Sequence, residues 1–179
     1  MPRESPIAQL LHSGLLVELD KAREAKAATP VTASHLAGEI CLPSLAPRAT
    51  LRPHHVRNVA RASITAMTTL KWRGLASVIA RMRHQNQSHG AAEAPDREAL
   101  SQLVCTFALL RPFFFASRDR CLLTAFALSE FLSRYRVRAQ CVIGVHARPF
   151  GAHCWLEHEN FVLNDTVERV RRYAPILRV

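Results

Sequence analysis

Long apolar runs are missing from this chain: no stretch reaches the roughly 18 uninterrupted apolar residues that a membrane-spanning helix needs. The N-terminal residues also lack a sustained apolar segment followed by a small-residue cleavage site, which argues against a signal peptide. The cysteines are odd in number, five, and none stands in a Cys-x-x-Cys pair, so a disulfide framework is not expected. These absences predict a cytoplasmic protein without a membrane span.

Motifs for several common chemistries are absent as well. The six glycines are dispersed, and neither a phosphate-cradling glycine loop nor a Gly-x-Ser-x-Gly motif occurs. The segment HCWLEH (153–158) lacks the His-Glu-x-x-His spacing of a zinc peptidase. A zinc site built from scattered ligands is an alternative, and it would draw on Cys121, Cys141, Cys154, His146, His153 and His158. We expect neither a metal nor a cofactor.

Acidic residues are in the minority, with 14 Asp and Glu against 24 Lys and Arg, and nearly all of the net charge of +10 comes from arginine. The basic residues are scattered along the chain. No zinc finger, RNP-like aromatic pair or helix-turn-helix is evident, so we expect no nucleic-acid partner. Two interpretations stay open: a solvated basic surface, or an electrostatic attraction for an acidic peptide substrate.

The chain has 179 residues, which is enough for one domain with a hydrophobic core and a small appendage. Residues 1–27 contain one short amphipathic stretch, which predicts a helical arm. Residues 28–53 carry four prolines, which forbid a continuous helix and predict a Pro-rich linker. Residues 54–179 then form the main domain.

Helical spacing of apolar residues predicts one long helix over residues 54–84, with a kink or a break at Gly74. Asp96 is a good N-cap for a second helix, DREALSQLVCTFALL (96–110). Later in the chain, the β-branched residues of VIGV (142–145) predict a strand.

Cys121 stands at the start of the apolar, helix-period segment CLLTAFALSEFLSRY (121–135). A helix N-terminus stabilises a thiolate, which is the nucleophilic form of cysteine. Arg118 and Arg120 would favour the thiolate, whereas Asp119 would oppose it. The alternative is a buried cysteine that acts as a small apolar residue, but the polar residues before Cys121 favour partial exposure.

His153 and Asp165 are the candidate partners of this thiol. A nucleophilic cysteine needs an imidazole nearby, and the imidazole needs a third group, usually a carboxylate, to fix its tautomer. If the chain forms a hairpin around a three-residue loop at 158–160, Glu157 lies opposite Phe161. His153 then lies opposite Asp165, on the same face of the sheet.

The loop and the strand alternation complete this hairpin model. Asn160 would take the left-handed position that closes a three-residue loop. Trp155 would share the face of His153, where it either walls the site or packs in the core. If His153 faces the nucleophile helix, alternation turns Cys154 and His158 away from it.

Four pieces of residues 110–179 occur together: a Cys-Leu that opens a helix, the VIGV strand, the PF-x-x-H-x-W block, and an LND that ends the next strand. This pattern resembles the C-terminal half of the lasso-peptide biosynthesis B proteins, which are leader peptidases of the transglutaminase-like, papain-related cysteine protease superfamily. The resemblance implies that Cys121 is the nucleophile, His153 the general base and Asp165 the acid that orients it.

Two further segments bear on this resemblance. Tyr135-Arg136 stands where many relatives have a glycine after the nucleophile helix, which weakens the helix stop signal. Residues 10–16, LLHSGLL, resemble the closing helix of the peptide-recognition element often fused ahead of this peptidase. The arm at 1–27 is therefore either a remnant of that element or a packing arm.

We expect an α+β fold, with a helical N-terminal half followed by a transglutaminase-like core. In that core the nucleophile helix packs on a small antiparallel sheet of about three to five strands. The residues predict acyl transfer at an amide through a thioester to Cys121.

The resemblance implies that residues 54–179 are a cysteine peptidase domain that removes the leader from a ribosomal lasso-precursor peptide. It also implies an asparagine-synthetase-like lasso cyclase as a partner, and possible dependence on a separate leader-recognition element. The alternatives are an acyl transferase of the transglutaminase or arylamine-acetyltransferase type, and a non-catalytic basic binding protein.

Overall fold

The computed structural model describes residues 36–40, 51–88, 96–115, 121–147 and 149–179. The chain divides into two compact units, residues 1–30 and residues 31–179, and every described residue belongs to the second. The helical arm predicted for residues 1–27 therefore lies outside the described residues, as does most of the predicted linker.

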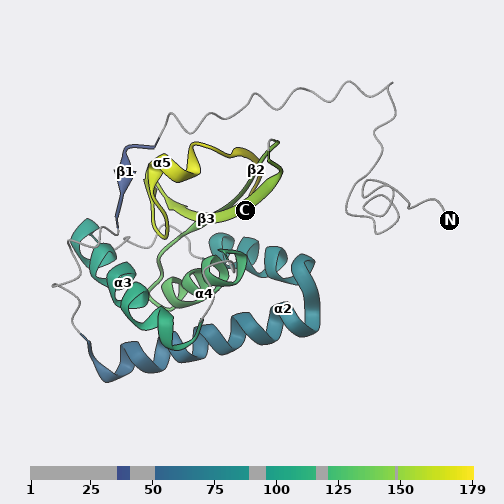
Figure 1. Ribbon diagram of the computed structural model, residues 1–179. Helices are drawn as coiled ribbons and strands as arrows, with labels where there is room; N and C mark the ends of the chain where they lie inside the picture. The colour runs from purple at the N-terminus through teal and green to yellow at the C-terminus, as the bar shows by residue number, and fades with distance from the viewer. Residues whose placement is uncertain (1–35, 41–50, 89–95, 116–120, 148) are drawn as a thin grey trace. The chain divides into compact units, whose positions relative to one another are not determined.

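Helices fill the N-terminal half of the described chain and strands most of the C-terminal half (Figure 1). The helices are α2 (Pro53–Ser88), α3 (Arg97–Leu110), the short 3₁₀-helix η3 (Arg111–Phe113), α4 (Cys121–Ser133) and α5 (Val167–Val170). The strands are β1 (Gly38–Glu39), β2 (Gln140–His146), β3 (Gly151–His158), β4 (Phe161–Val162) and β5 (Ala174–Arg178).

Local signals place the first two helices. The kink or break predicted at Gly74 is confirmed, because this residue interrupts α2 with φ 74° and ψ −178°, a conformation that glycine adopts without steric cost. The predicted N-cap of α3 is also confirmed: the Asp96 side chain accepts a hydrogen bond from the Ala99 backbone N–H at 2.7 Å.

The five strands form one sheet in the order β1-β4-β3-β2-β5. Strand β3 pairs antiparallel with both β2 and β4, β2 pairs antiparallel with β5, and β1 pairs parallel with β4. Residues 38–39, which fall in the predicted linker, thus form an edge strand. The fold is a mixed α+β fold with a mostly antiparallel sheet, as expected.

The predicted register of the hairpin is wrong. Glu157 pairs with Val162, and His158 pairs with Phe161, so only two residues form the loop. Glu159, with φ 52°, takes the left-handed conformation that was predicted for Asn160. Regular pairing stops after Val162, because β4 has only two residues. Asp165 therefore never occupies a strand position opposite His153.

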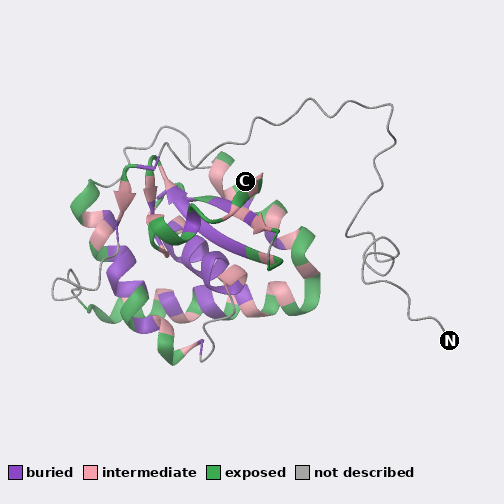
Figure 2. Ribbon diagram, turned by 45° about the horizontal axis from the view of Figure 1, so that its top comes forward, coloured by how far each residue is buried: buried purple, intermediate pink, exposed green. Residues whose placement is uncertain are grey.

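Helix α4 is the centre of the core, and all of its residues from Leu123 to Leu132 are buried (Figure 2). It contacts α2, α3 and the β3 strand. Cys154 and Leu156 of β3 belong to the same core cluster as the apolar side chains of α4. Trp155 belongs to a second cluster with Val142 and Val170, on the opposite face of the sheet. Cys154 therefore faces α4, whereas the sequence pattern predicted that it turns away from the helix that begins at Cys121.

A buried ion pair fixes α4 against the second half of α2. The carboxylate of Glu130 is 2 % exposed, and it accepts hydrogen bonds from Arg81 Nε at 2.5 Å and from Gln85 Nε2 at 2.6 Å. A buried carboxylate is costly unless it is paired in this way. The pairing therefore favours one alignment of the two helices.

Helix α4 ends without glycine. Arg136 takes the left-handed conformation, with φ 59°, and the Val137 N–H donates back to the Leu132 carbonyl at 3.2 Å. An L-residue with a Cβ pays roughly 1–2 kcal/mol for this conformation, a cost that glycine avoids.

We predict that Arg136→Gly raises the free energy of unfolding by up to about 1 kcal/mol, because relief of the backbone strain exceeds the extra chain entropy of glycine. Urea unfolding followed by circular dichroism measures the change. Arg134→Gly is the control, since Arg134 is equally exposed and has no positive φ; it should be neutral or destabilising. A loss of stability in Arg136→Gly would contradict this account.

Candidate active site

Cys121 is the first residue of α4 and is partly buried. Strand β4 covers β3 only at Glu157 and His158, and the thiol lies at the uncovered part of that edge, beside Cys154. The side chain of His153 is the main cause that lowers the pKa of the Cys121 thiol. Burial opposes this effect, while the backbone N–H groups of Cys154 and Leu122 add to it.

His153 lies on β3 and is 7 % exposed. Its ring stacks on Trp155 at a centroid distance of 6.0 Å and lies 5.1 Å from the ring of Tyr173. Burial lowers the pKa of His153, but the hydrogen bond to Asp165 and the nearby Cys121 thiol outweigh burial and raise this pKa to about 9.

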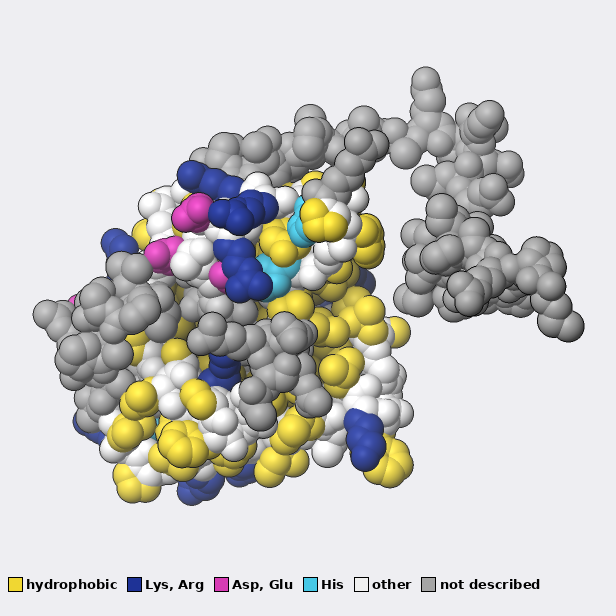
Figure 3. Space-filling view, in the orientation of Figure 1, with side chains coloured by type: hydrophobic (Ala, Val, Ile, Leu, Met, Phe, Trp, Pro, Cys, Tyr) yellow, Lys and Arg dark blue, Asp and Glu magenta, His cyan; other side chains and the backbone are white. Residues whose placement is uncertain are grey.

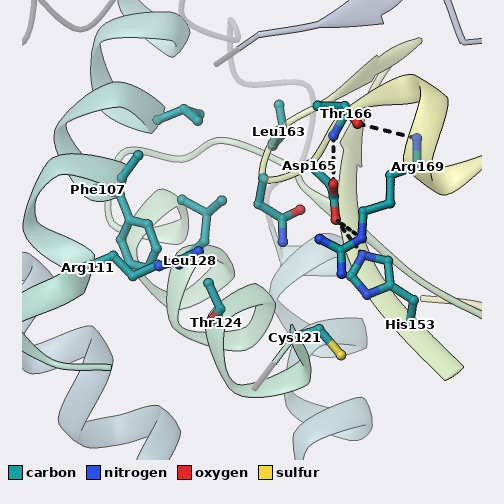
Figure 4. Close-up of a pocket in the computed structure, with 13 residues that line it drawn as sticks. Phe107, Arg111, Cys121, Thr124, Leu128, His153, Leu163, Asp165, Thr166 and Arg169 are labelled. Carbon is teal, nitrogen blue, oxygen red and sulfur yellow. Dashed lines mark hydrogen bonds and ion pairs between the residues drawn. The ribbon is translucent and has the colours of Figure 1, made fainter. Parts of the chain in front are cut away.

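Asp165 follows the bend after β4, and its side chain is 11 % exposed. Its Oδ2 lies 2.5 Å from His153 Nε2, and its Oδ1 accepts the Thr166 N–H at 2.8 Å (Figure 4). Arg169 Nε lies 3.8 Å from Oδ2. Burial raises the pKa of Asp165, but the bonds to His153 and Thr166 lower it below the ordinary value.

The structure thus brings the three predicted site residues together, although not through the predicted strand register. A lowered thiol pKa and a raised imidazole pKa favour a thiolate beside an imidazolium. The carboxylate on Nε2 holds the imidazole ring in place and stabilises its charge. This arrangement has the groups that a thiol nucleophile, a proton donor and an orienting carboxylate would require.

Asn164 is a site residue that the sequence reasoning did not single out. Its Oδ1 accepts the N–H of Leu156 at 2.8 Å, and the Leu163 N–H donates to the Leu156 carbonyl at 2.9 Å. Asn164 thereby satisfies the β3 edge where β4 has stopped, and it fixes the bend that carries Asp165. The LND segment contained the signal, because asparagine often replaces backbone pairing at a bend.

A pocket of about 470 Å³ opens onto these residues. Apolar side chains of α3, of α4 and of the bend after β4 form much of its wall, with two arginines at its margins (Figure 4). The lining residues are Val104, Phe107, Ala108, Arg111, Cys121, Thr124, Leu128, His153, Leu163, Asn164, Asp165, Thr166 and Arg169. A pocket of this size fits a short stretch of peptide.

The remaining candidate residues have other surroundings. Trp155 is fully buried and donates from Nε1 to Glu157 Oε1 at 2.7 Å, so it supports the His153 ring from the core. The sulfur atoms of Cys141 and Cys154 lie 3.4 Å apart, and this contact together with burial raises the pKa of Cys154. Both thiols are buried, unlike Cys121.

Neither a metal cluster nor a membrane span occurs in the part of the chain that the structure describes. Among those residues, no three His, Cys, Asp or Glu side chains form a group that would hold a metal ion. None of the described helices is long and apolar enough to cross a membrane.

A family model for the transglutaminase-like superfamily matches residues 60–178, which are 119 of the 179 residues. The chain belongs to the transglutaminase-like superfamily. Members of this superfamily are typically cysteine-based enzymes, and the matched region contains Cys121, His153 and Asp165. Comparisons with curated proteins and with solved structures found no match.

We predict that His153→Ala slows alkylation of Cys121 by iodoacetamide at pH 7 by about tenfold or more. The imidazole of His153 is the main cause of the lowered thiol pKa, so its removal reduces the thiolate fraction at neutral pH. In the unmodified protein, alkylation should persist below the ordinary thiol range and fall only as pH drops through the lowered pKa. Mass spectrometry of the Cys121 peptide measures both rates.

The control for this experiment is His158→Ala. His158 lies on the same strand, but its Nδ1 lies 2.6 Å from the Arg138 carbonyl oxygen, which accepts its hydrogen bond. Its removal should leave the alkylation rate unchanged. An equal rate in His153→Ala and the unmodified protein would show that the imidazole does not activate the thiol.

We also predict that Asp165→Asn lowers the free energy of unfolding by about 1–3 kcal/mol at pH 6. The folded-state pKa of His153 is raised, so its contribution is complete below the unfolded value of 6.5 and is lost as pH rises through about 9. The pKa of Asp165 is lowered, so the carboxylate is ionised throughout this range. Urea unfolding at pH 6 and 9.5 should show the larger difference at pH 6; an equal difference would refute the assignment of the ion pair.

Proposed function

We propose that this protein is a cysteine peptidase that removes the leader from a ribosomal lasso-precursor peptide. The observation that carries the proposal is the gathering of three groups at one pocket: Cys121 at the start of α4, His153, which lowers the pKa of that thiol, and Asp165, which is bonded to His153 Nε2. The family supports cysteine-based chemistry. The choice of a leader peptide rests on the sequence pattern of residues 110–179.

The reaction follows from these charges. The Cys121 thiolate attacks the carbonyl carbon of the scissile amide, and the imidazolium of His153 gives its proton to the departing amine, which leaves a thioester. His153 then takes a proton from water, the resulting hydroxide attacks the thioester, and the Cys121 thiolate leaves. The carboxylic acid product gives its proton to solvent, and the thiolate and imidazolium of the starting state are restored. Asp165 keeps the imidazole oriented and stabilises it while it is charged.

The proposed partners follow from the same resemblance. The precursor peptide is the substrate, an asparagine-synthetase-like cyclase closes the ring on the released core, and a separate element assists leader recognition. The surface near the site is rich in arginine: Figure 3 shows dark blue side chains gathered where α5 lies in Figure 1, and Arg169, Arg171 and Arg172 are exposed there. Such a surface favours approach of an acidic peptide segment.

We predict that the protein, incubated with a precursor peptide and its recognition and cyclase partners, releases a leader with a free carboxylate. Mass spectrometry in H₂¹⁸O should place the heavy oxygen on that carboxylate. Cys121→Ser should slow cleavage by at least about a thousandfold. The matched control is Cys105→Ala, since Cys105 is buried in α3 and does not line the pocket.

The outcomes separate the proposed peptidase from its alternatives. Transfer of the acyl group to an added amine, with no heavy oxygen in the product, would identify a transglutaminase or arylamine-acetyltransferase type of enzyme. Cleavage that persists in Cys121→Ser would exclude this cysteine as the nucleophile. Binding of the peptide without any turnover would favour the non-catalytic binding protein.

A further inference from the structure

We infer that Arg111 is a substrate-binding residue, which pairs with a carboxylate group of the peptide held in the Cys121 pocket. The inference rests on the proposed function, and it specifies the substrate class as peptides that carry a carboxylate near the scissile amide. The carboxylate belongs either to an acidic side chain or to a free C-terminus.

The backbone around Arg111 is fixed at the end of α3. The Arg111 N–H donates to the Phe107 carbonyl, and its own carbonyl accepts from the N–H groups of Phe114 and Phe115 at 3.0 Å. The side chain therefore leaves the helix at a defined point, and it lines the pocket from the α3 side. Figure 4 shows it running past Phe107 toward Leu128, across the pocket from Asp165.

The charges that line the pocket do not balance. The Cys121 thiolate pairs with the His153 imidazolium, and Asp165 pairs with Arg169 as well as with His153. Arg111 is partly buried, and its guanidinium has no hydrogen bond or ion pair with any residue that the structure describes. Among the described pocket residues one positive charge is thus left without a partner, with donor groups that match a carboxylate in a two-point arrangement.

Arg169 does not fill this role. Its side chain is 59 % exposed, and it already lies against Asp165. The C-terminal dipole of α3 favours a cation at Arg111, but this interaction leaves the hydrogen-bond donors of the guanidinium unused. Among the described residues that line the pocket, Arg111 is therefore the cation without an ion-pair partner.

The wall between Arg111 and the thiol shows what else the ligand contains. Thr124 and Leu128 follow Cys121 on one side of α4, and Phe107 faces them from α3. A ligand that reaches from the Cys121 sulfur to the Arg111 guanidinium must lie over these side chains. A ligand with an apolar group beside a carboxylate contacts these side chains with the apolar group and pairs with the Arg111 guanidinium through the carboxylate.

The test is protection of Cys121 from iodoacetamide by unreactive tripeptides. N-acetyl-Leu-Glu-Leu-amide carries a side-chain carboxylate, N-acetyl-Leu-Gln-Leu carries a C-terminal carboxylate, and N-acetyl-Leu-Gln-Leu-amide carries neither. We predict that one of the two anionic peptides halves the alkylation rate at a concentration about tenfold lower than the neutral peptide. The anionic peptide that does so identifies the source of the carboxylate.

Variants assign the effect to Arg111. Arg111→Gln should abolish the preference for the anionic peptide, measured relative to the alkylation rate of the same variant without peptide, and Arg111→Lys should keep part of the preference. Arg83→Gln removes an equal charge from an exposed position on α2 and should keep all of it. A purely structural role would change thermal stability in Arg111→Gln but not the difference between the peptides.

Two results would overturn the inference: an equal effect of all three peptides on the unmodified protein, or a preference that survives in Arg111→Gln. This readout requires no turnover. A protein that binds the anionic peptide through Arg111 but cleaves no precursor would refute the proposed peptidase while supporting the binding role of Arg111. A protein that cleaves the precursor but shows no preference for the anionic peptides would refute the binding role alone.

Discussion

The hydrogen bond between His153 Nε2 and Asp165 Oδ2, 2.5 Å long, joins two segments that the sheet itself does not bring together. Strand β4 stops at Val162, and the bend that follows is held by Asn164 through the N–H of Leu156. The carboxylate depends on this bend for its position, and His153 depends on the carboxylate for much of its raised pKa. The charge state of Cys121 depends in turn on His153.

The packing of α4 holds Cys121, the remaining residue of the site, just as firmly. Helix α4 is buried along most of its length, so the residue at its start moves only if the core is repacked. Glu130 adds a directional contact to this apolar packing, because its carboxylate accepts from Arg81 and Gln85 of α2. The thiol is thus presented by the most buried of the described helices, against the part of the β3 edge that β4 leaves uncovered.

Sequence patterns predicted those features that neighbouring residues decide. The N-cap at Asp96, the interruption at Gly74 and the start of a helix at Cys121 all follow from local backbone requirements. The hairpin register was wrong because it depends on how far β4 continues to pair. A one-residue difference in loop length reverses which side chains share a face.

The sequence by itself determined the kinds of side chain at the site: one thiol at a helix start, an imidazole on a strand and a carboxylate 12 residues later. It also set the excess of arginine. Only the tertiary structure decided which charges meet, because pairing requires contact between segments distant in the chain. Folding places Arg169 beside Asp165 and leaves Arg111 across the pocket with no partner among the described residues. A rule based on neighbouring residues cannot distinguish Arg111 from Arg169, because they differ in which side chains the fold packs against them.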